Sequence, residues 1–206
     1  MEYVLIIGHD IDFEAFNFKN KYVIGIDEGA YLALKAGVKL DVAIGDFDSI
    51  DQDKLEYLKK NTKVIELSAR KNDTDTGAAL KLCKDASRIV LLGGIQGKRI
   101  EHFIANLLLM EKNPKIEMLD NNSHMYIMDS SFSLKKTEYK FISFFALEDT
   151  ILTLEGFAYP LNKYYLKNTD PLTISNELIA KQGVVSLKGG RVLVIQSKEE
   201  TNEKVC

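Results

Sequence analysis

The sequence has 206 residues with 27 basic and 30 acidic side chains, so its formal net charge is −3. Apolar residues make up 46% and charged residues 28%, which is the composition of a globular protein with a sizeable core and excludes a disordered chain. The slightly acidic balance argues against a binder of nucleic acids or anionic membranes, and no apolar run is long enough to cross a bilayer.

The first 120 residues alternate short apolar runs with helix-like stretches. Continuous apolar runs indicate strands that are covered on both faces, as in a parallel sheet. This alternation predicts an open α/β sheet with right-handed crossovers. The expected strands are 3–7, 22–26, 42–44, 64–67, 89–92 and 116–119, and the expected helices are 30–36, 51–59, 76–84 and 102–110.

Residues at the ends of these stretches match the preferences of helix boundaries. Gly37 follows the first helix, where a C-terminal glycine is expected, and Ser49 and Thr74 precede the second and third helices as N-caps. The opening apolar run is short, so we expect a buried strand there and not a signal peptide.

The pattern changes after residue 120. Short strand-like runs follow without a helical period, which predicts a small antiparallel β-sandwich. Gly189-Gly190 predicts a hairpin turn with positive φ between the last two runs. We expect one domain over 1–122, a second over 123–206, and a frayed tail over 197–204. The strands expected in the second domain are 132–134, 141–146, 151–154, 184–187 and 192–195.

Polar clusters follow four of the strands predicted in the α/β domain. Ligands of open α/β sheets bind beyond the carboxyl ends of the strands, so we expect these clusters to meet at one edge. Asp46 and Asp48 are two residues apart, which in an extended chain places both carboxylates on one side. Mg²⁺ would offset their repulsion and bridge to phosphate, although helix capping is an equally good explanation of this pair alone. The four clusters are 25–29, 45–49, 71–75 and 93–102.

Two further features favour phosphate chemistry. Asp73 and Asp75 add carboxylates at the same edge, and the glycine-rich stretch 93–99 suggests phosphate contact through backbone N–H groups. That stretch is neither a P-loop nor a dinucleotide fingerprint. Glu101 and His102 add an acid–base pair at a helix start, although a lone histidine is more often structural. No serine, cysteine or zinc hydrolase motif is present, which leaves metal-assisted phosphate chemistry as the leading interpretation.

Five motifs together carry a resemblance to a known family. They are Gly25-Ile26-Asp27-Glu28-Gly29-Ala30, Gly45-Asp46-Phe47-Asp48-Ser49-Ile50, Asn72-Asp73-Thr74-Asp75, Gly97-Lys98-Arg99-Ile100-Glu101-His102 with Ala105-Asn106, and Ser175-Asn176-Glu177. In order and spacing the chain resembles thiamine pyrophosphokinase along nearly its whole length. The resemblance implies an α/β nucleotide-binding domain followed by a β-sandwich. It also implies transfer of a pyrophosphoryl group from ATP to the hydroxyl of thiamine, giving thiamine diphosphate and AMP.

The resemblance also implies roles for individual side chains. Metal ligands for Mg²⁺ would be Asp46, Asp48 and Asp75. Residues at the ATP site would be Asp27, Thr74, Arg99, His102 and Asn106. Glu101 would accept the proton of the thiamine hydroxyl, and Ser175 and Asn176 would contact thiamine.

The chain departs from the family pattern at four positions, Glu28, Asn72, Lys98 and Glu101, where the family has Gly, Asp, Gly and Asp. Some members of the family stack a tryptophan on the pyrimidine ring of thiamine, and this chain has no tryptophan. The aromatic side chains that could replace it are Phe157, Tyr164 and Tyr165, with core packing as the alternative for each.

We further expect a homodimer with shared active sites, in which Ser175-Asn176 of one chain completes the metal cluster of the other. A sandwich of roughly 75 residues is marginal alone and gains stability from a partner. The two cysteines form no disulfide or zinc pattern, so we expect a cytoplasmic protein. Two other functions stay open at this point: a phosphatase with Asp46 as nucleophile, and a catalytically silent nucleotide or thiamine sensor.

Overall fold

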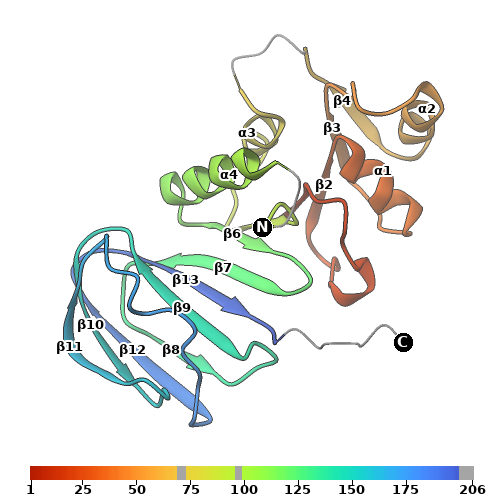
Figure 1. The fold of residues 1–206 in the computed structure, drawn as a ribbon. Helices are drawn as coiled ribbons and strands as arrows, with labels where there is room; N and C mark the ends of the chain where they lie inside the picture. The colour runs from red at the N-terminus through yellow and green to blue at the C-terminus, as the bar shows by residue number, and fades with distance from the viewer. Residues whose placement is uncertain (69–72, 96–98, 200–206) are drawn as a thin grey trace. The chain divides into compact units, whose positions relative to one another are not determined.

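The computed structural model describes residues 1–68, 73–95 and 99–199 (Figure 1). The chain forms two compact units, which divide between Asn121 and Asn122. Asn72, Lys98 and most of the predicted frayed tail lie outside the described residues.

The first unit is built on a parallel sheet with the strand order β4-β3-β2-β1-β5-β6, in which each neighbouring pair is parallel. The predicted α/β fold is therefore confirmed, and the order along the sequence reverses between β1 and β5. The strands are β1 (Glu2–Ile6), β2 (Tyr22–Ile26), β3 (Val42–Gly45), β4 (Lys63–Glu66), β5 (Arg88–Leu92) and β6 (Ile116–Leu119). The helices are η1 (Phe13–Ala15), α1 (Glu28–Lys35), α2 (Gln52–Asn61), α3 (Asp75–Leu80) and α4 (Ile100–Lys112).

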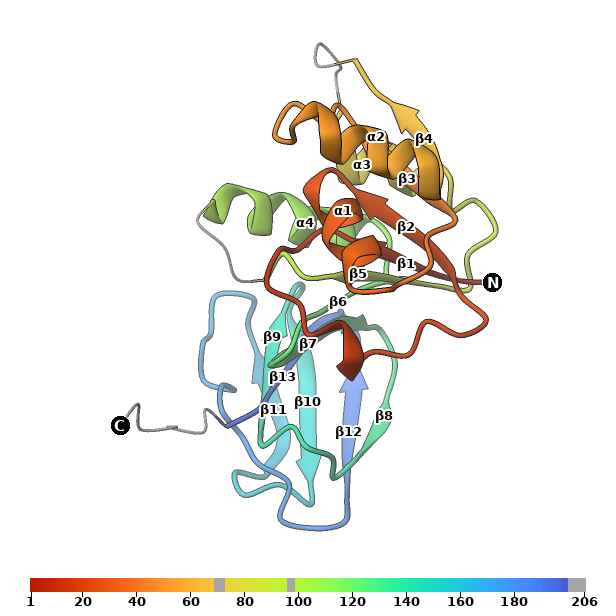
Figure 2. The same cartoon turned by 90° about the vertical axis from the view of Figure 1, so that its right-hand side faces the viewer.

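Helices cover both faces of this sheet, with α1 and α2 on one side and α3 and α4 on the other (Figures 1 and 2). Val4, Val23 and Ala43 share a buried cluster with Ala33 of α1 and Leu58 of α2. Burial on both faces explains why the strands are continuous apolar runs. Among the described residues, no helix has the length and apolar character needed to cross a membrane.

The helix boundaries follow the predictions in two of three cases. Gly37 adopts φ 81° directly after the C-cap of α1, and the Thr74 side chain accepts a hydrogen bond from the N–H of Gly77 at 3.0 Å. Ser49 was the wrong choice of N-cap for α2. Asp51 caps that helix and accepts from the N–H of Lys54 at 2.9 Å, since α2 begins two residues later than a Ser49 cap requires.

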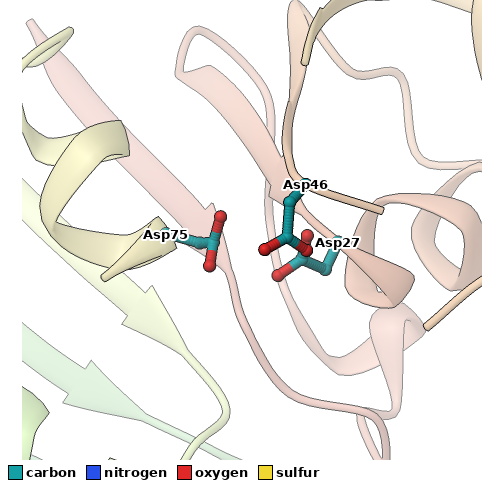
Figure 3. Close-up of side chains that lie close together, drawn as sticks. All are labelled: Asp27, Asp46 and Asp75. Atoms are coloured by element: carbon teal, nitrogen blue, oxygen red, sulfur yellow. The ribbon is translucent and has the colours of Figure 1, made fainter. Parts of the chain in front are cut away.

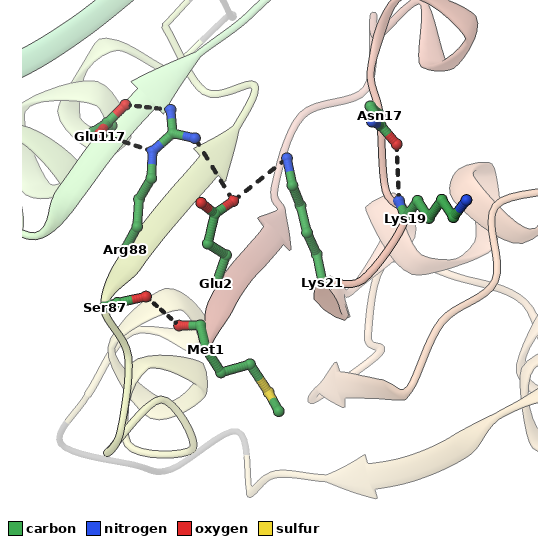
Figure 4. A network of polar contacts seen from close by, with 8 residues as sticks. All are labelled: Met1, Glu2, Asn17, Lys19, Lys21, Ser87, Arg88 and Glu117. Carbon is green, nitrogen blue, oxygen red and sulfur yellow. Dashed lines mark hydrogen bonds and ion pairs between the residues drawn. The ribbon is translucent and has the colours of Figure 1, made fainter.

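Ion pairs tie the central strands together at the amino edge of the sheet (Figure 4). The Arg88 guanidinium of β5 donates to both carboxylate oxygens of Glu117 on β6, at 2.9 and 2.7 Å. Glu2 of β1 lies 3.8 Å from Arg88 and 3.6 Å from Lys21. The hydrogen bond to Glu117 raises the pKa of Arg88, so the guanidinium stays protonated. This network stabilises the edge opposite the carboxyl ends of the strands.

In the second unit the strands lie in the orders β7-β13-β9 and β11-β10-β12-β8, and each neighbouring pair is antiparallel. Its strands are β7 (Ser123–Met128), β8 (Phe132–Lys135), β9 (Phe141–Ala146), β10 (Thr150–Glu155), β11 (Leu161–Leu166), β12 (Gln182–Lys188) and β13 (Val192–Ser197). Buried residues of both sheets, such as Phe144, Leu152 and Val185, form one core. The expected antiparallel β-sandwich is present in this unit.

The hairpin predicted at Gly189-Gly190 is wrong, although both glycines do have positive φ, 76° and 68°. β12 pairs with β10 and β8, whereas β13 pairs with β7 and β9. The two glycines therefore connect one sheet to the other. A turn sequence fixes local backbone geometry but not the partner of each strand, so it could not reveal this crossing.

Candidate functional site

Three carboxylates from separate elements meet at the carboxyl edge of the parallel sheet (Figure 3). Asp27 precedes α1, Asp46 follows β3, and Asp75 begins α3. One oxygen of each lies within 4.8 Å of the others, and all three side chains are partly buried. Three negative charges at this spacing repel one another, and oxygen-only ligand sets suit hard cations such as Mg²⁺. The donor set therefore fits a divalent cation.

Strained backbone conformations position the carboxylates of Asp27 and Asp46. Asp27 has φ 48° and Phe47 has φ 54°, a region that residues other than glycine seldom adopt. The Phe47 ring is buried in the core at 5% exposure, and its N–H donates to Asp27 Oδ1 at 3.4 Å. A strained backbone that is anchored by a buried ring holds the loop after β3 against the loop after β2.

The same strain separates Asp46 from Asp48. β3 ends at Gly45 and Phe47 is in the left-handed region, so the extended chain on which we based a same-side placement does not form here. Asp48 is exposed and does not belong to the three-carboxylate group, which contains Asp27 instead. The Asp48 N–H donates to Asp46 Oδ1 at 3.4 Å. Metal binding by Asp48 remains a prediction.

Gly45 leaves the space that the Asp27 carboxylate occupies. A Cβ atom at residue 45 would lie 1.8 Å from Asp27 Oδ1 and 3.2 Å from the Asp27 backbone nitrogen. We therefore expect Gly45→Ala to displace this carboxylate and to weaken Mn²⁺ binding, measured by electron paramagnetic resonance, by about tenfold or more, or roughly 1.4 kcal/mol. Gly37→Ala is the control, because it strains a positive φ but meets no atom within 4 Å. Equal Mn²⁺ affinity of the two variants would contradict this account of Gly45.

The first turn of α3 presents Asp75. The Thr74 side chain caps the N-terminus of α3, and this structural role alone explains why a threonine stands at that position of the motif. Asp73 Oδ2 lies 2.9 Å from the Lys81 ammonium, and this hydrogen bond lowers the pKa of Asp73. Asp73, which precedes the N-cap of α3, is therefore paired with the C-cap residue of that helix, whereas the Asp75 side chain lies toward Asp27 and Asp46 (Figure 3).

The residues predicted on α4 form their own contacts. Arg99 Nε donates to Glu101 Oε1 at 2.8 Å, and both side chains are exposed. This hydrogen bond lowers the pKa of Glu101, which keeps it ionised but makes it a weaker proton acceptor. His102 is exposed, and Asn106 is buried at 6% exposure near Gly94. The structure thus places Arg99 and Glu101 together, not in the carboxylate group.

A close approach of two loops marks the point where the strand order reverses. A Cβ atom at Gly8, after β1, would lie 2.7 Å from the Gly93 Cα, after β5. Ligands of open α/β sheets bind at such a switch point. From the sequence, Gly93 was singled out but Gly8 was not. The position of Gly8 directly after the first strand was the signal that could have indicated this close approach.

The second unit holds the two predicted thiamine contacts. Ser175 is exposed with φ 54°, and its N–H donates to Ser143 Oγ at 2.9 Å. Asn176 is only 3% exposed, and its amide binds the backbone of Tyr159 and Glu177. The Ser175 side chain is thus available to a ligand, whereas the Asn176 amide is engaged within the protein.

Comparison with known proteins identifies relatives of both units. Residues 13–119 match the family model of the thiamin pyrophosphokinase catalytic domain, and residues 130–192 match that of its vitamin B1 binding domain. The thiamine pyrophosphokinase of Bacillus subtilis is 33% identical over 198 residues, which cover 91% of this chain and 92% of that protein.

Solved structures agree. A crystal structure of the Bacillus subtilis thiamine pyrophosphokinase superposes with a TM-score of 0.87 at 31% identity, covering 97% of this chain and 99% of that one. The Geobacillus thermodenitrificans thiamin pyrophosphokinase gives a TM-score of 0.85 at 26% identity, covering 97% and 98%.

Proposed function

This chain belongs to the thiamine pyrophosphokinase family, and on that premise we propose that its three-carboxylate group is the centre at which ATP is bound for pyrophosphoryl transfer to thiamine. The activity is that of a thiamine diphosphokinase, which forms thiamine diphosphate and AMP. The observation that carries the proposal is the convergence of Asp27, Asp46 and Asp75 within 4.8 Å at the carboxyl edge of the sheet.

Positioning and charge neutralisation supply most of the catalysis in phosphoryl transfers. Asp27, Asp46 and Asp75 would hold Mg²⁺, which when bound neutralises charge on the phosphates of ATP. The hydroxyl oxygen of thiamine forms a bond to the β-phosphorus, while the bond from that phosphorus to the oxygen bridging the α- and β-phosphates breaks. AMP leaves in line with the attacking oxygen.

The Arg99–Glu101 pair would act at the phosphates. The guanidinium can exchange the Glu101 carboxylate for phosphate oxygens, to which it donates in the same fork geometry. Glu101, released from Arg99, would then orient the thiamine hydroxyl or take its proton. His102 and Asn106 would complete the ATP side from the same helix.

Ser175 would contact thiamine from the second unit. Because this residue and the carboxylate group belong to different units, we propose that the working enzyme is a homodimer in which each active site takes Ser175 from the partner subunit. We also propose a cytoplasmic location, where ATP is available and the buried Cys83 thiol stays reduced.

The test of this function is the nucleotide product. Incubation with thiamine, ATP and Mg²⁺ should give AMP and thiamine diphosphate in equal amounts, and chelation of the cation should stop both. Release of ADP would indicate a monophosphoryl transfer, and release of inorganic phosphate would indicate a phosphatase. Either result would overturn the proposal, and so would nucleotide binding without turnover.

A further inference from the structure

Asn176 is a buried polar side chain whose hydrogen-bonding groups are turned toward the protein. Its Oδ1 accepts from the N–H of Tyr159 at 3.0 Å and from the N–H of Glu177 at 2.9 Å. Its Nδ2 donates to the carbonyl of Tyr159 at 2.8 Å. An amide with these three bonds and 3% exposure has little capacity left for a ligand.

These bonds fix the segment that contains Asn176 against the segment that contains Tyr159. The Asn176 backbone is itself held by Ile142, with N···O distances of 2.7 and 2.9 Å in the two directions, and the N–H of Ala158 donates to the carbonyl of Glu177 at 2.8 Å. The Phe157 ring is anchored in the sandwich core at 1% exposure. Tyr159, two residues later, is 69% exposed. The Asn176 amide therefore fixes the backbone of an exposed aromatic residue, Tyr159, and Asn176 directly follows Ser175 in the chain.

The aromatic residues that the sequence suggested as stacking partners are engaged elsewhere. Phe157 belongs to the core, Tyr164 donates its hydroxyl to Asp170 at 2.6 Å, and Tyr165 donates to Asp149 at 2.8 Å. The hydrogen bond to a carboxylate raises the pKa of each of the two tyrosines. Tyr159 combines high exposure with a backbone clamped from both its N–H and its carbonyl.

We propose that Asn176 is a positioning residue that acts through Tyr159, whose exposed ring covers the thiamine bound at Ser175. The inference rests on the proposed thiamine site. Thiamine is planar, heteroaromatic and positively charged, and the face of a tyrosine ring attracts such a ligand by stacking and by cation–π interaction. A clamped backbone reduces the conformational freedom that the ring loses on binding.

The absence of tryptophan in this chain gives a direct probe of the ring at position 159. In the Tyr159→Trp variant all tryptophan fluorescence comes from that residue. We expect thiamine to quench it in a saturable titration, because an indole also stacks and attracts cations.

The positioning role is tested by repeating the titration in this background with changes at residue 176. Asn176→Ala removes all three hydrogen bonds and should raise the Kd for thiamine about tenfold or more. Asn176→Asp keeps the acceptor oxygen but loses the donor to the Tyr159 carbonyl, and should give a smaller increase. If the Asn176→Ala variant does not fold, the Kd of the Asn176→Asp variant tests the positioning role in its place.

Thr173→Val is the matched control. Thr173 is 5% exposed, lies three residues away in the same segment, and donates its hydroxyl to the carbonyl of Phe144. The change removes one buried hydrogen bond with little change of shape, so it should lower the Tm and leave the Kd for thiamine unchanged.

The outcomes separate this inference from the proposed function. If the wild-type protein forms no thiamine diphosphate, the proposed function fails. If the wild type is active but thiamine does not quench the Tyr159→Trp variant, the ring does not cover the substrate and the inference is wrong. If quenching occurs and the Asn176 variants bind thiamine as tightly as Thr173→Val does, Asn176 is merely structural and the positioning role is refuted.

Discussion

Asp46→Asn is expected to lower the kcat for thiamine diphosphate formation by about a thousandfold or more, equivalent to roughly 4 kcal/mol, with the fold intact. The substitution keeps the shape of the side chain but removes one negative charge from the group of Asp27, Asp46 and Asp75. The loss should fall on kcat because a cation held by these carboxylates would stabilise charge that develops in the transition state. The measurement is steady-state formation of AMP at saturating ATP, Mg²⁺ and thiamine.

Asp51→Asn is the matched control. It makes the same chemical change five residues away, at an N-cap where asparagine serves as well as aspartate, so activity should be preserved. More than about a tenth of wild-type activity in a folded Asp46→Asn variant would show that Asp46 is not part of the proposed metal site, since the barrier would have risen by less than roughly 1.4 kcal/mol. The same substitution at Asp48 decides whether this exposed residue joins the centre when ATP is bound.

Mixing two inactive variants should restore activity if the active sites are shared. One variant is Asp46→Asn and the other is the double change Ser175→Ala and Asn176→Ala. After subunit exchange about half of the dimers contain one subunit of each kind, and each of these has one site free of substitutions. By two-fold symmetry, roughly a quarter of wild-type activity should return.

The control for complementation is the same mixture before exchange, which should stay at background activity. Native mass spectrometry would establish that mixed dimers form. Background activity in a sample that contains mixed dimers would show that each active site belongs to one chain, and the shared-site proposal would be wrong. A monomeric wild-type enzyme with full activity would also refute the shared site.

Sequence patterns predicted the first unit well because each of its elements carries its own signal. β1, β2, β3 and β5 are almost entirely buried, and the predicted runs lie within about one residue of these strands, of β6 and of the partly exposed edge strand β4. Helix ends were less certain: α3 ends at Leu80, four residues before the predicted end. Ser49 failed as a cap because several polar residues precede α2, and composition does not say which of them turns back to bind the helix.

The second unit was harder because its strands are covered on one face only. β11 was missed, since it is mostly exposed and its pairing with β10 shifts register between Leu152 and Leu154. β7 was missed because it begins at Ser123, directly at the predicted domain boundary, and we expected no strand in the second domain before residue 132. Pairing partners are set by tertiary packing, which a local pattern does not contain.

For the site, the sequence indicated the right segments but not the arrangement of their side chains. Asp46 and Asp75 were expected as metal ligands and do lie together, whereas Asp27, expected only at the ATP site, is their third partner in the structure. The difference arises from the positive φ of Phe47, an unfavourable conformation that no residue preference predicts. For Asn176 the motif was found, but the direction of the side chain was not, because a motif gives no information on whether an amide faces a ligand or the protein.

The central claim, transfer of an intact pyrophosphoryl group from ATP to thiamine, is tested most directly by following labelled phosphates in a single turnover. With ATP labelled separately at each phosphorus, the β and γ labels should both appear in thiamine diphosphate, and the α label should appear only in AMP. Mg²⁺ chelation should abolish the appearance of all three labels in these products. Appearance of the γ label alone in a thiamine ester, or of either label as free phosphate in place of thiamine diphosphate, would contradict this account.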